Sequence, residues 1–209
     1  MQASSTQAAQ TNTRRLILAS GSAYRKELLH RLRLPFDVMS PDIDESSLPD
    51  ETPVETAMRL AQAKAQKIAD QTESALVIGS DQVATMDNLQ IGKPGNHANA
   101  LAQLQMMRGR SVVFHTALCL IDTTPTSSMP LQIENIQTVV TFRDLPDAEL
   151  DAYLKIEQPY DCAGSAKNEG LGIALIASVV GTDPTALTGL PLIALTSMLR
   201  NCGVSFFHA

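Results

Sequence analysis

Residues 75–79, with the sequence ALVIG, form a continuous apolar run that is closed by polar residues. A strand without polar alternation is typical of a sheet that is covered on both faces, so this run predicts a central strand between two layers. Residues 16–19 form another apolar run, followed by a small-residue turn and by leucines at helical spacing. Residues 111–122 and 132–142 alternate like a pair of long antiparallel strands. Strand-helix units together with an antiparallel pair predict an α/β fold with a mixed sheet.

The clearest helix signal is the sequence TPVE at residues 52–55, which has a capping threonine, proline at the first helical position and glutamate three residues after the cap. An apolar stripe with Lys64 at its border follows, and its alanines predict close packing on a sheet: Val54, Met58, Ala61, Ala65 and Ile68. The other expected elements are strands at 36–40 and near 170–180, a hairpin over 83–91 that turns at 86–88, and helices over 99–107, 148–156 and 191–199.

The composition predicts a single globular domain over residues 14–209. The chain has 209 residues, of which 44% are hydrophobic and 18% charged, which is enough for a sizeable core. Residues 1–13 lack the basic start and apolar run of a secretory signal, and we expect a disordered tail there. The formal net charge of -6 argues against binding to nucleic acid or to an anionic membrane, so any phosphate site must be a local pocket.

Several classes of site have no support in the sequence. Cys119, Cys162 and Cys202 lie far apart without metal-binding spacing, which favours a reducing cytoplasm. The four histidines are scattered, so no zinc site is expected, and no serine lies in a GxSxG motif. No apolar stretch is long enough to cross a bilayer.

Two cations lie where the first helix should begin. If Ser22 caps this helix, Arg25 and Lys26 lie in its first turn, where a cation opposes the helix dipole by about 0.3 to 1 kcal/mol. Free backbone N–H groups and two cations at a strand-to-helix turn predict a phosphate site. The alternative is that both side chains reach into water.

Two carboxylates and one further lysine are candidates for catalysis. Asp81 directly follows the 75–79 run, where open α/β sheets have their ligand crevice, although an aspartate there is also a common turn cap. Glu45 lies in an acidic loop and Lys93 follows the expected hairpin; alone, each is a solvated surface charge. Small residues around Lys167 and Glu169 predict a backbone that closely approaches a ligand or another segment, or a plain glycine-rich turn.

Seven motifs, in order, resemble the Maf family of nucleoside triphosphate pyrophosphatases: LILASGSAYRKELL, IDES, LAQAKA, IGSDQV, IGKP, CAGSAKNEG and GLPL. The resemblance extends from about residue 15 to about residue 200. It implies an elongated, ITPase-like α/β fold whose two lobes flank a cleft. It also implies a divalent metal, Mg²⁺ or Mn²⁺, and hydrolysis of a nucleoside triphosphate to the monophosphate and pyrophosphate. A homodimer is what the family suggests.

The resemblance also implies roles for particular residues. Asp81 matches the catalytic acidic residue and, with Glu45, would hold the metal. The phosphate-handling positions match Ser20, Ser22, Arg25, Lys26, Lys64 and Lys93. The chain departs from the family pattern at Ala23, where proline is frequent, and at Lys26, where a second arginine is frequent. Lysine keeps the charge of arginine but loses its bidentate geometry.

Three positions resemble the 7-methyl-GTP subgroup: Tyr24, Gln82 and Glu169. The dTTP/UTP subgroup tends to have threonine after the catalytic aspartate and glutamine in place of the glutamate. A carboxylate at Glu169 can accept hydrogen bonds from the N1–H and the exocyclic amine of guanine. Methylation at N7 makes the base cationic, which also favours a carboxylate and the aromatic face of Tyr24.

The sequence leaves alternatives for the chemistry. Either Asp81 takes the proton of the attacking water, or a metal-bound hydroxide attacks, because an unperturbed aspartate with a pKa near ~3.9 is a weak base. Besides 7-methyl-GTP hydrolysis, a dTTP/UTP pyrophosphatase and a nucleotide-binding division regulator with little turnover are the alternative functions.

Overall fold

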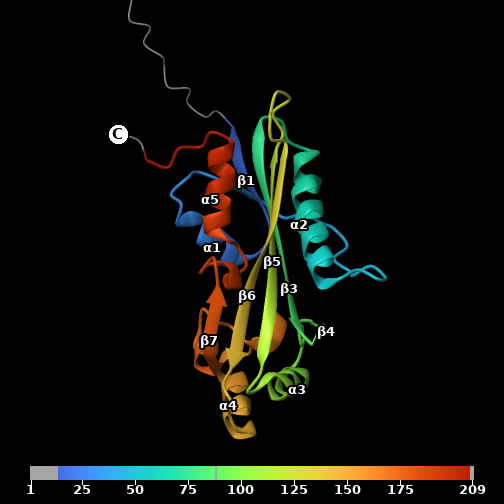
Figure 1. Ribbon diagram of the computed structural model, residues 1–209, viewed down its shortest axis with the longest axis vertical. Coiled ribbons are helices and arrows are strands. Elements are labelled where there is room, and N and C mark those ends of the chain that lie inside the picture. The colour runs from blue at the N-terminus through green and yellow to red at the C-terminus, as the bar shows by residue number, and fades with distance from the viewer. Residues whose placement is uncertain (1–13, 88, 208–209) are drawn as a thin grey trace, which may run out of the picture.

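The computed structural model of the protein describes residues 14–87 and 89–207. Within these residues the fold is an elongated sheet of seven strands with helices on its faces (Figure 1). The strands are β1 (Arg15–Ala19), β2 (Asp37–Met39), β3 (Ala75–Met86), β4 (Leu89–Ile91), β5 (Ser111–Asp122), β6 (Leu131–Phe142) and β7 (Ile176–Gly181). The helices are α1 (Ala23–His30), α2 (Pro53–Ala69), α3 (His97–Met107), α4 (Asp147–Glu157) and α5 (Leu192–Asn201), and the short 3₁₀ turns are η1 (Ala163–Ser165), η2 (Leu171–Leu175) and η3 (Ala186–Thr188). The tail expected over 1–13 lies outside the described residues, and none of the described helices is long and apolar enough to span a membrane.

The sheet is mixed, as the sequence predicts. Its strand order is β2-β1-β3-β5-β6-β7, with β4 paired to β3. β1 runs parallel to β2 and β3, whereas β3, β5, β6 and β7 are antiparallel neighbours. The long pairing of β5 with β6, from Ser111↔Thr141 to Ile121↔Leu131, confirms the predicted antiparallel pair.

Strand β3 is longer than the sequence predicts. We expected a strand over 75–79 that ends before Asp81, but one strand of 12 residues continues to Met86. The strand continues because Val83, Ala84 and Met86 are also buried, and because β5 pairs with β3 from Leu76 to Thr85. Asp81 therefore lies inside a strand and does not follow its end.

On the edge away from β5, strand β3 changes its partner halfway along. The β1 ladder ends at Ala19↔Gly79, and the β4 ladder begins at Ala84↔Ile91. Among the described residues, neither β1 nor β4 pairs with 80–83, so the sheet opens at this point while β5 still supports the other edge. The expected hairpin is present as the β3–β4 pair, although residue 88 in its turn lies outside the described part.

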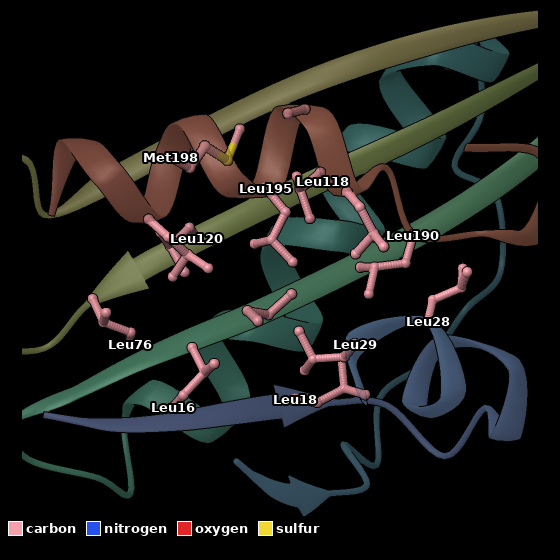
Figure 2. Close-up of a cluster of buried hydrophobic side chains, with 14 of the residues drawn as sticks. Leu16, Leu18, Leu28, Leu29, Leu76, Leu118, Leu120, Leu190, Leu195 and Met198 are labelled. Carbon is pink, nitrogen blue, oxygen red and sulfur yellow. The ribbon is translucent and has the colours of Figure 1, made fainter. Parts of the chain in front are cut away.

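Separate hydrophobic cores define two lobes along the sheet. In the lobe of α1 and α5, Leu29 and Leu195 are fully buried in one cluster with Leu18, and Figure 2 shows these side chains between the helices and the strands. In the other lobe, α3 and α4 pack on the far ends of β3, β5 and β6 around Leu104 and Leu154. The three long strands pass through both lobes and connect them (Figure 1).

Helix α2 covers the face of the sheet opposite α1 and α5, and its backbone lies directly on β3. The predicted capping box of Thr52 and Glu55 is present. Of the predicted stripe, Ala61, Ala65 and Ile68 are buried, but Val54 and Met58 are only partly buried. A Cβ atom at Gly79 would lie 2.2 Å from the carbonyl oxygen of Ala61 and 2.8 Å from the nitrogen of Ala65. This contact rotates the helix so that Lys64 is also buried.

We predict that Gly79→Ala lowers the free energy of unfolding by about 3 kcal/mol, because the added methyl group forces α2 away from β3. For a chain of this size such a loss corresponds to a fall in melting temperature of roughly 6 to 12 °C. Gly92→Ala is the matched control, because no atom lies within 4 Å of a Cβ at Gly92. Thermal unfolding of both variants tests this, and equal melting temperatures would refute the packing argument.

Candidate active site

A cleft of about 930 Å³ opens at the break in the sheet and contains most of the residues predicted from the sequence. Its wall includes Ser20, Ser22, Tyr24, Arg25, Glu45, Lys64, Asp81, Gln82, Lys93 and Glu169. These residues come from the turn after β1 together with the start of α1, the loop after β2, helix α2, strand β3, the segment after β4, and the loop before β7. Six segments far apart in sequence therefore contribute polar side chains to one cavity.

The two faces of β3 carry different parts of the site. Successive strand residues point to opposite faces, so Gly79 and Asp81 face α2, whereas Ser80 and Gln82 face the other way. The contact of α2 with Gly79 brings Lys64, from the same helix face, next to Asp81. The carboxylate thus meets a lysine because the position two residues before it has no side chain.

Lys64 links two carboxylates. Its Nζ lies 2.6 Å from Oδ1 of Asp81 and 3.0 Å from Oε1 of Glu45. The side chains of Lys64 and Asp81 are only 6% and 9% exposed, whereas that of Glu45 is 55% exposed. A buried ammonium must be paired, and here it is paired twice. The cluster of two acids and one lysine carries a net negative charge and can attract a further cation.

Arg25 is held inside the cleft by the start of α1. Ser22 caps this helix, as predicted, since its Oγ accepts a hydrogen bond from the backbone N–H of Arg25 at 3.4 Å. The Arg25 Nε donates to the carbonyl oxygen of Gly189 at 2.8 Å, and its Nη1 lies 3.5 Å from Oγ of Ser20. Burial lowers the pKa of Arg25, and the charges of Asp81 and Glu45 oppose this shift. Arginine stays protonated, so the cleft contains a fixed cation close to its acids.

Lys26 does not belong to this cleft. Its side chain is exposed and does not contribute to the cleft wall. Adjacent helical residues point about 100° apart, and α1 turns Ala23, Tyr24 and Arg25 toward the cavity but not Lys26. The structure thus places Arg25 in the cleft wall and leaves the Lys26 side chain exposed outside it, while a role of Lys26 in handling phosphate stays a prediction.

Gln82 reaches the cleft, but its amide is directed to a backbone turn. Its Nε2 lies 2.8 Å from Oγ1 of Thr116, 3.0 Å from the carbonyl oxygen of Ala186 and 3.1 Å from that of Leu187. The amide donors are therefore used to hold the 186–189 turn, which itself lines the cleft at Leu187, Thr188 and Gly189. Gln82 acts on the cleft through the position of this turn.

The residues that hold this turn had no role predicted from the sequence. Oγ of Ser80 lies 2.9 Å from the carbonyl oxygen of Gly189, and Oγ1 of Thr116 donates to that of Ala186 at 3.0 Å. Both hydroxyl groups are fully buried. A signal was present in the motif GLPL, which begins at Gly189, and in two polar residues inside otherwise apolar strands.

Glu169 and Tyr24 line the same cleft from different lobes. The Glu169 side chain is exposed, on the loop that joins η1 to η2. The small residues predicted to allow close approach do so within the chain itself, since a Cβ at Gly172 would lie 2.5 Å from the backbone nitrogen and oxygen of Lys167. The Lys167 Nζ lies 5.9 Å from the centre of the Tyr24 ring.

The oxygen donors suit a divalent cation that also binds substrate. Asp81 and Glu45 both reach the Lys64 ammonium, so the two carboxylates can meet at one cation. In the described part of the chain no group of three or more His, Cys, Asp or Glu side chains is arranged to hold a metal ion. Mg²⁺ commonly uses one or two carboxylates together with substrate phosphates, and this donor set fits that pattern.

Comparisons with known proteins agree with this geometry. Residues 15–202 match the Maf family, described as Maf-like protein. A 7-methyl-GTP pyrophosphatase of Burkholderia pseudomallei (strain 1710b) is 65% identical over 198 residues, which cover 93% of this chain and 91% of the relative. A 7-methyl-GTP pyrophosphatase of Cupriavidus metallidurans is 63% identical over 194 residues, covering 93% of this chain and 96% of the relative.

Among solved structures, a HAM1 protein from Coxiella burnetii is 21% identical, with a TM-score of 0.44 over 64% of this chain and 75% of that chain. The family is assigned from the family match and the sequence relatives, not from this structure. Because the family match spans nearly the whole chain and relatives above 60% identity cover more than nine-tenths of it, the chain belongs to the Maf family.

Proposed function

We propose that this protein is a nucleoside triphosphate pyrophosphatase that hydrolyses 7-methyl-GTP to 7-methyl-GMP and pyrophosphate. The observation that carries the proposal is one cleft that contains two cations beside two carboxylates, together with an aromatic ring and a third carboxylate for the base. The cations are Arg25 and Lys64, and the base-facing residues are Tyr24 and Glu169. Relatives above 60% identity that are named 7-methyl-GTP pyrophosphatase support the choice of substrate.

The triphosphate needs positive charge and hydrogen-bond donors. Arg25, Lys64 and Lys93 line the cleft and would offset the phosphate charges. The first N–H groups of α1 have no partners within the helix and point toward its N-terminal end, which is a favourable position for an anion. These donors are fixed before substrate binds, so they stabilise the charge that develops on the leaving pyrophosphate.

A divalent cation, Mg²⁺ or Mn²⁺, would be held by Glu45 and Asp81. When bound, such an ion polarises a phosphoryl oxygen and stabilises the negative charge of the transition state. Lys64 orients Asp81 through the 2.6 Å contact and is close enough to contact a phosphate that approaches both acids. Asp81 would accept the proton of the water that attacks the α-phosphorus, and the bond between the α-phosphorus and the bridging oxygen then breaks to release pyrophosphate.

The base would be recognised by charge and by hydrogen bonds. A carboxylate at Glu169 accepts from N1–H and from the exocyclic amine of guanine. The N7-methylated ring is cationic, and the face of Tyr24 attracts such a ring. Uracil and thymine lack this pair of adjacent donors, so the same carboxylate would disfavour them.

Pyrophosphate release over a nucleotide panel tests the proposal directly. With Mg²⁺ or Mn²⁺ present, we expect 7-methyl-GTP to have the highest kcat/KM, at least about tenfold above GTP, dTTP and UTP. The product should be pyrophosphate and not inorganic phosphate. A preference for dTTP or UTP would assign the other subgroup, and tight nucleotide binding without turnover would favour the regulator.

We predict that Asp81→Asn lowers kcat by about 10³-fold while the dissociation constant for 7-methyl-GTP changes by only a few-fold, because the amide keeps the shape but cannot take a proton. Asp87→Asn is the matched control, since Asp87 is an exposed aspartate just after β3 and outside the cleft wall. Steady-state kinetics and equilibrium binding check both variants. Near-normal turnover of Asp81→Asn would remove Asp81 from the reaction.

We predict that Glu169→Gln lowers kcat/KM for 7-methyl-GTP by about 10²-fold, because a neutral amide replaces an acceptor of two charge-assisted hydrogen bonds. UTP serves as the internal control, and its kcat/KM should stay unchanged or rise. The two substrates are compared with the same enzyme preparation. An equal loss for both would show that Glu169 does not read the base.

A further inference from the structure

We infer that Glu157 and Lys167 are positioning residues that set the charge and the shape of the base site, an inference that rests on the proposed function. Neither residue lines the cleft. Lys167 contacts Tyr24, which lines the cleft, and Glu157 contacts the positions on either side of Glu169, so they act through Tyr24 and through the loop that carries Glu169.

Glu157 fastens both ends of the Glu169 loop. At the last residue of α4, its Oε1 lies 3.1 Å from Nζ of Lys167, and its Oε2 accepts a hydrogen bond from the N–H of Leu171 at 3.0 Å. A Cβ at Gly170 would lie 2.8 Å from Oε1 of Glu157, so the loop is in close contact with this carboxylate. Since Glu169 lies between the two fastened positions, the segment of backbone that carries it is held by Glu157.

A second contact from the same helix fixes the start of the loop. The N–H of Lys167 donates to the hydroxyl of Tyr153 at 3.1 Å, and Tyr153 is buried in the core of the α3 and α4 lobe. The backbone of Lys167 is thereby tied to that lobe, while its side chain extends toward the other one. Lys167 connects the two lobes beside the cleft.

The Lys167 ammonium lies close to the ring that would face the base. Its distance of 5.9 Å from the centre of the Tyr24 ring is within the range of a cation–π contact. Glu157 and then Tyr24 raise the pKa of Lys167, and the Leu171 N–H followed by Lys167 lowers that of Glu157. Both groups are therefore charged at neutral pH.

The charge of Lys167 has a consequence for a cationic base. An unpaired ammonium near Tyr24 would repel N7-methylguanine but would have little effect on neutral guanine. Glu157 cancels this charge at 3.1 Å, so the side of the pocket behind Tyr24 is close to neutral. The carboxylate of Glu169 can then act on the cationic base without a competing positive charge. The ion pair thus favours the methylated base without touching it.

The test compares two ligands that differ by one methyl group and by the positive charge that it gives the base. Binding of 7-methyl-GMP and GMP is measured by calorimetric titration, so the result does not depend on turnover. Glu157→Gln keeps an oxygen acceptor for the Leu171 N–H but leaves Lys167 without a counter-charge. We expect the ratio of the affinity for 7-methyl-GMP to the affinity for GMP to fall about tenfold. Glu149→Gln, an exposed glutamate on the same helix, is the matched control and should leave the ratio unchanged.

Two further variants separate charge from structure. Lys167→Met leaves Glu157 unpaired and should move the ratio severalfold in the opposite direction, toward 7-methyl-GMP. Combining Lys167→Met with Glu157→Gln should restore the wild-type ratio to within about twofold. Equal losses for both ligands, or shifts of the same sign in the two single variants, would overturn the inference, because a merely structural role cannot produce opposite signs.

The same measurements distinguish this inference from the proposed function. The wild-type ratio reports whether the pocket prefers the methylated base at all. The change of that ratio in the variants reports on Glu157 and Lys167. A wild-type protein that prefers GMP would refute the assigned substrate. Opposite shifts of the ratio in the two single variants would still support the role of the ion pair. Unchanged ratios in both variants would refute that role.

Discussion

The contact between helix α2 and strand β3 is the constraint on which the site depends. With no side chain at Gly79, the carbonyl of Ala61 and the backbone of Ala65 can rest on the strand. Lys64 lies on the same helix face, and Asp81 lies two residues along the same strand face, so one packing contact brings a lysine to an aspartate. The ammonium then draws Glu45 from an exposed loop. A single close approach of backbone to backbone thus converts three charges that are distant in sequence into one cluster.

The position of the cleft follows from how β3 exchanges partners. β1 ends opposite Gly79 and β4 ends opposite Ala84, so the edge between them is open although β3 itself continues. In an open α/β sheet the ligand crevice lies beyond the carboxyl end of a strand, and here that strand is β1. Its last residue leads directly into Ser20 and the start of α1, which supplies Arg25. Asp81 reaches the crevice from the side, on a strand that β5 keeps rigid.

Much of this arrangement could be predicted from the sequence, and the failures have physical causes. Periodicity and caps are local, so the mixed sheet, the capping box at Thr52 and the Ser22 cap were predictable. The extent of β3 was not, because its polar residues Ser80 and Asp81 resemble a strand end unless their tertiary partners are known. The direction of Lys26 depends on how α1 is rotated against its core, which sequence spacing alone does not define. The family resemblance correctly predicted that Gln82 lies in the cavity. It could not predict the contacts of the Gln82 amide, because the backbone carbonyls concerned belong to a turn about a hundred residues away.

The two lobes have separate cores, and this separation determines how the base end can be controlled. Tyr24 belongs to the α1 and α5 lobe, whereas the loop of Glu169 is tied to α4 in the other lobe. The long strands hold the lobes at a fixed spacing, but they do not specify the last few ångströms between a ring and a carboxylate on a loop. Contacts that cross the gap must supply that precision, and Lys167 makes one of them. A charged contact of this kind affects both the position of its neighbours and the electrostatic potential around them. Residues outside the cavity wall can therefore influence which base the cavity accepts.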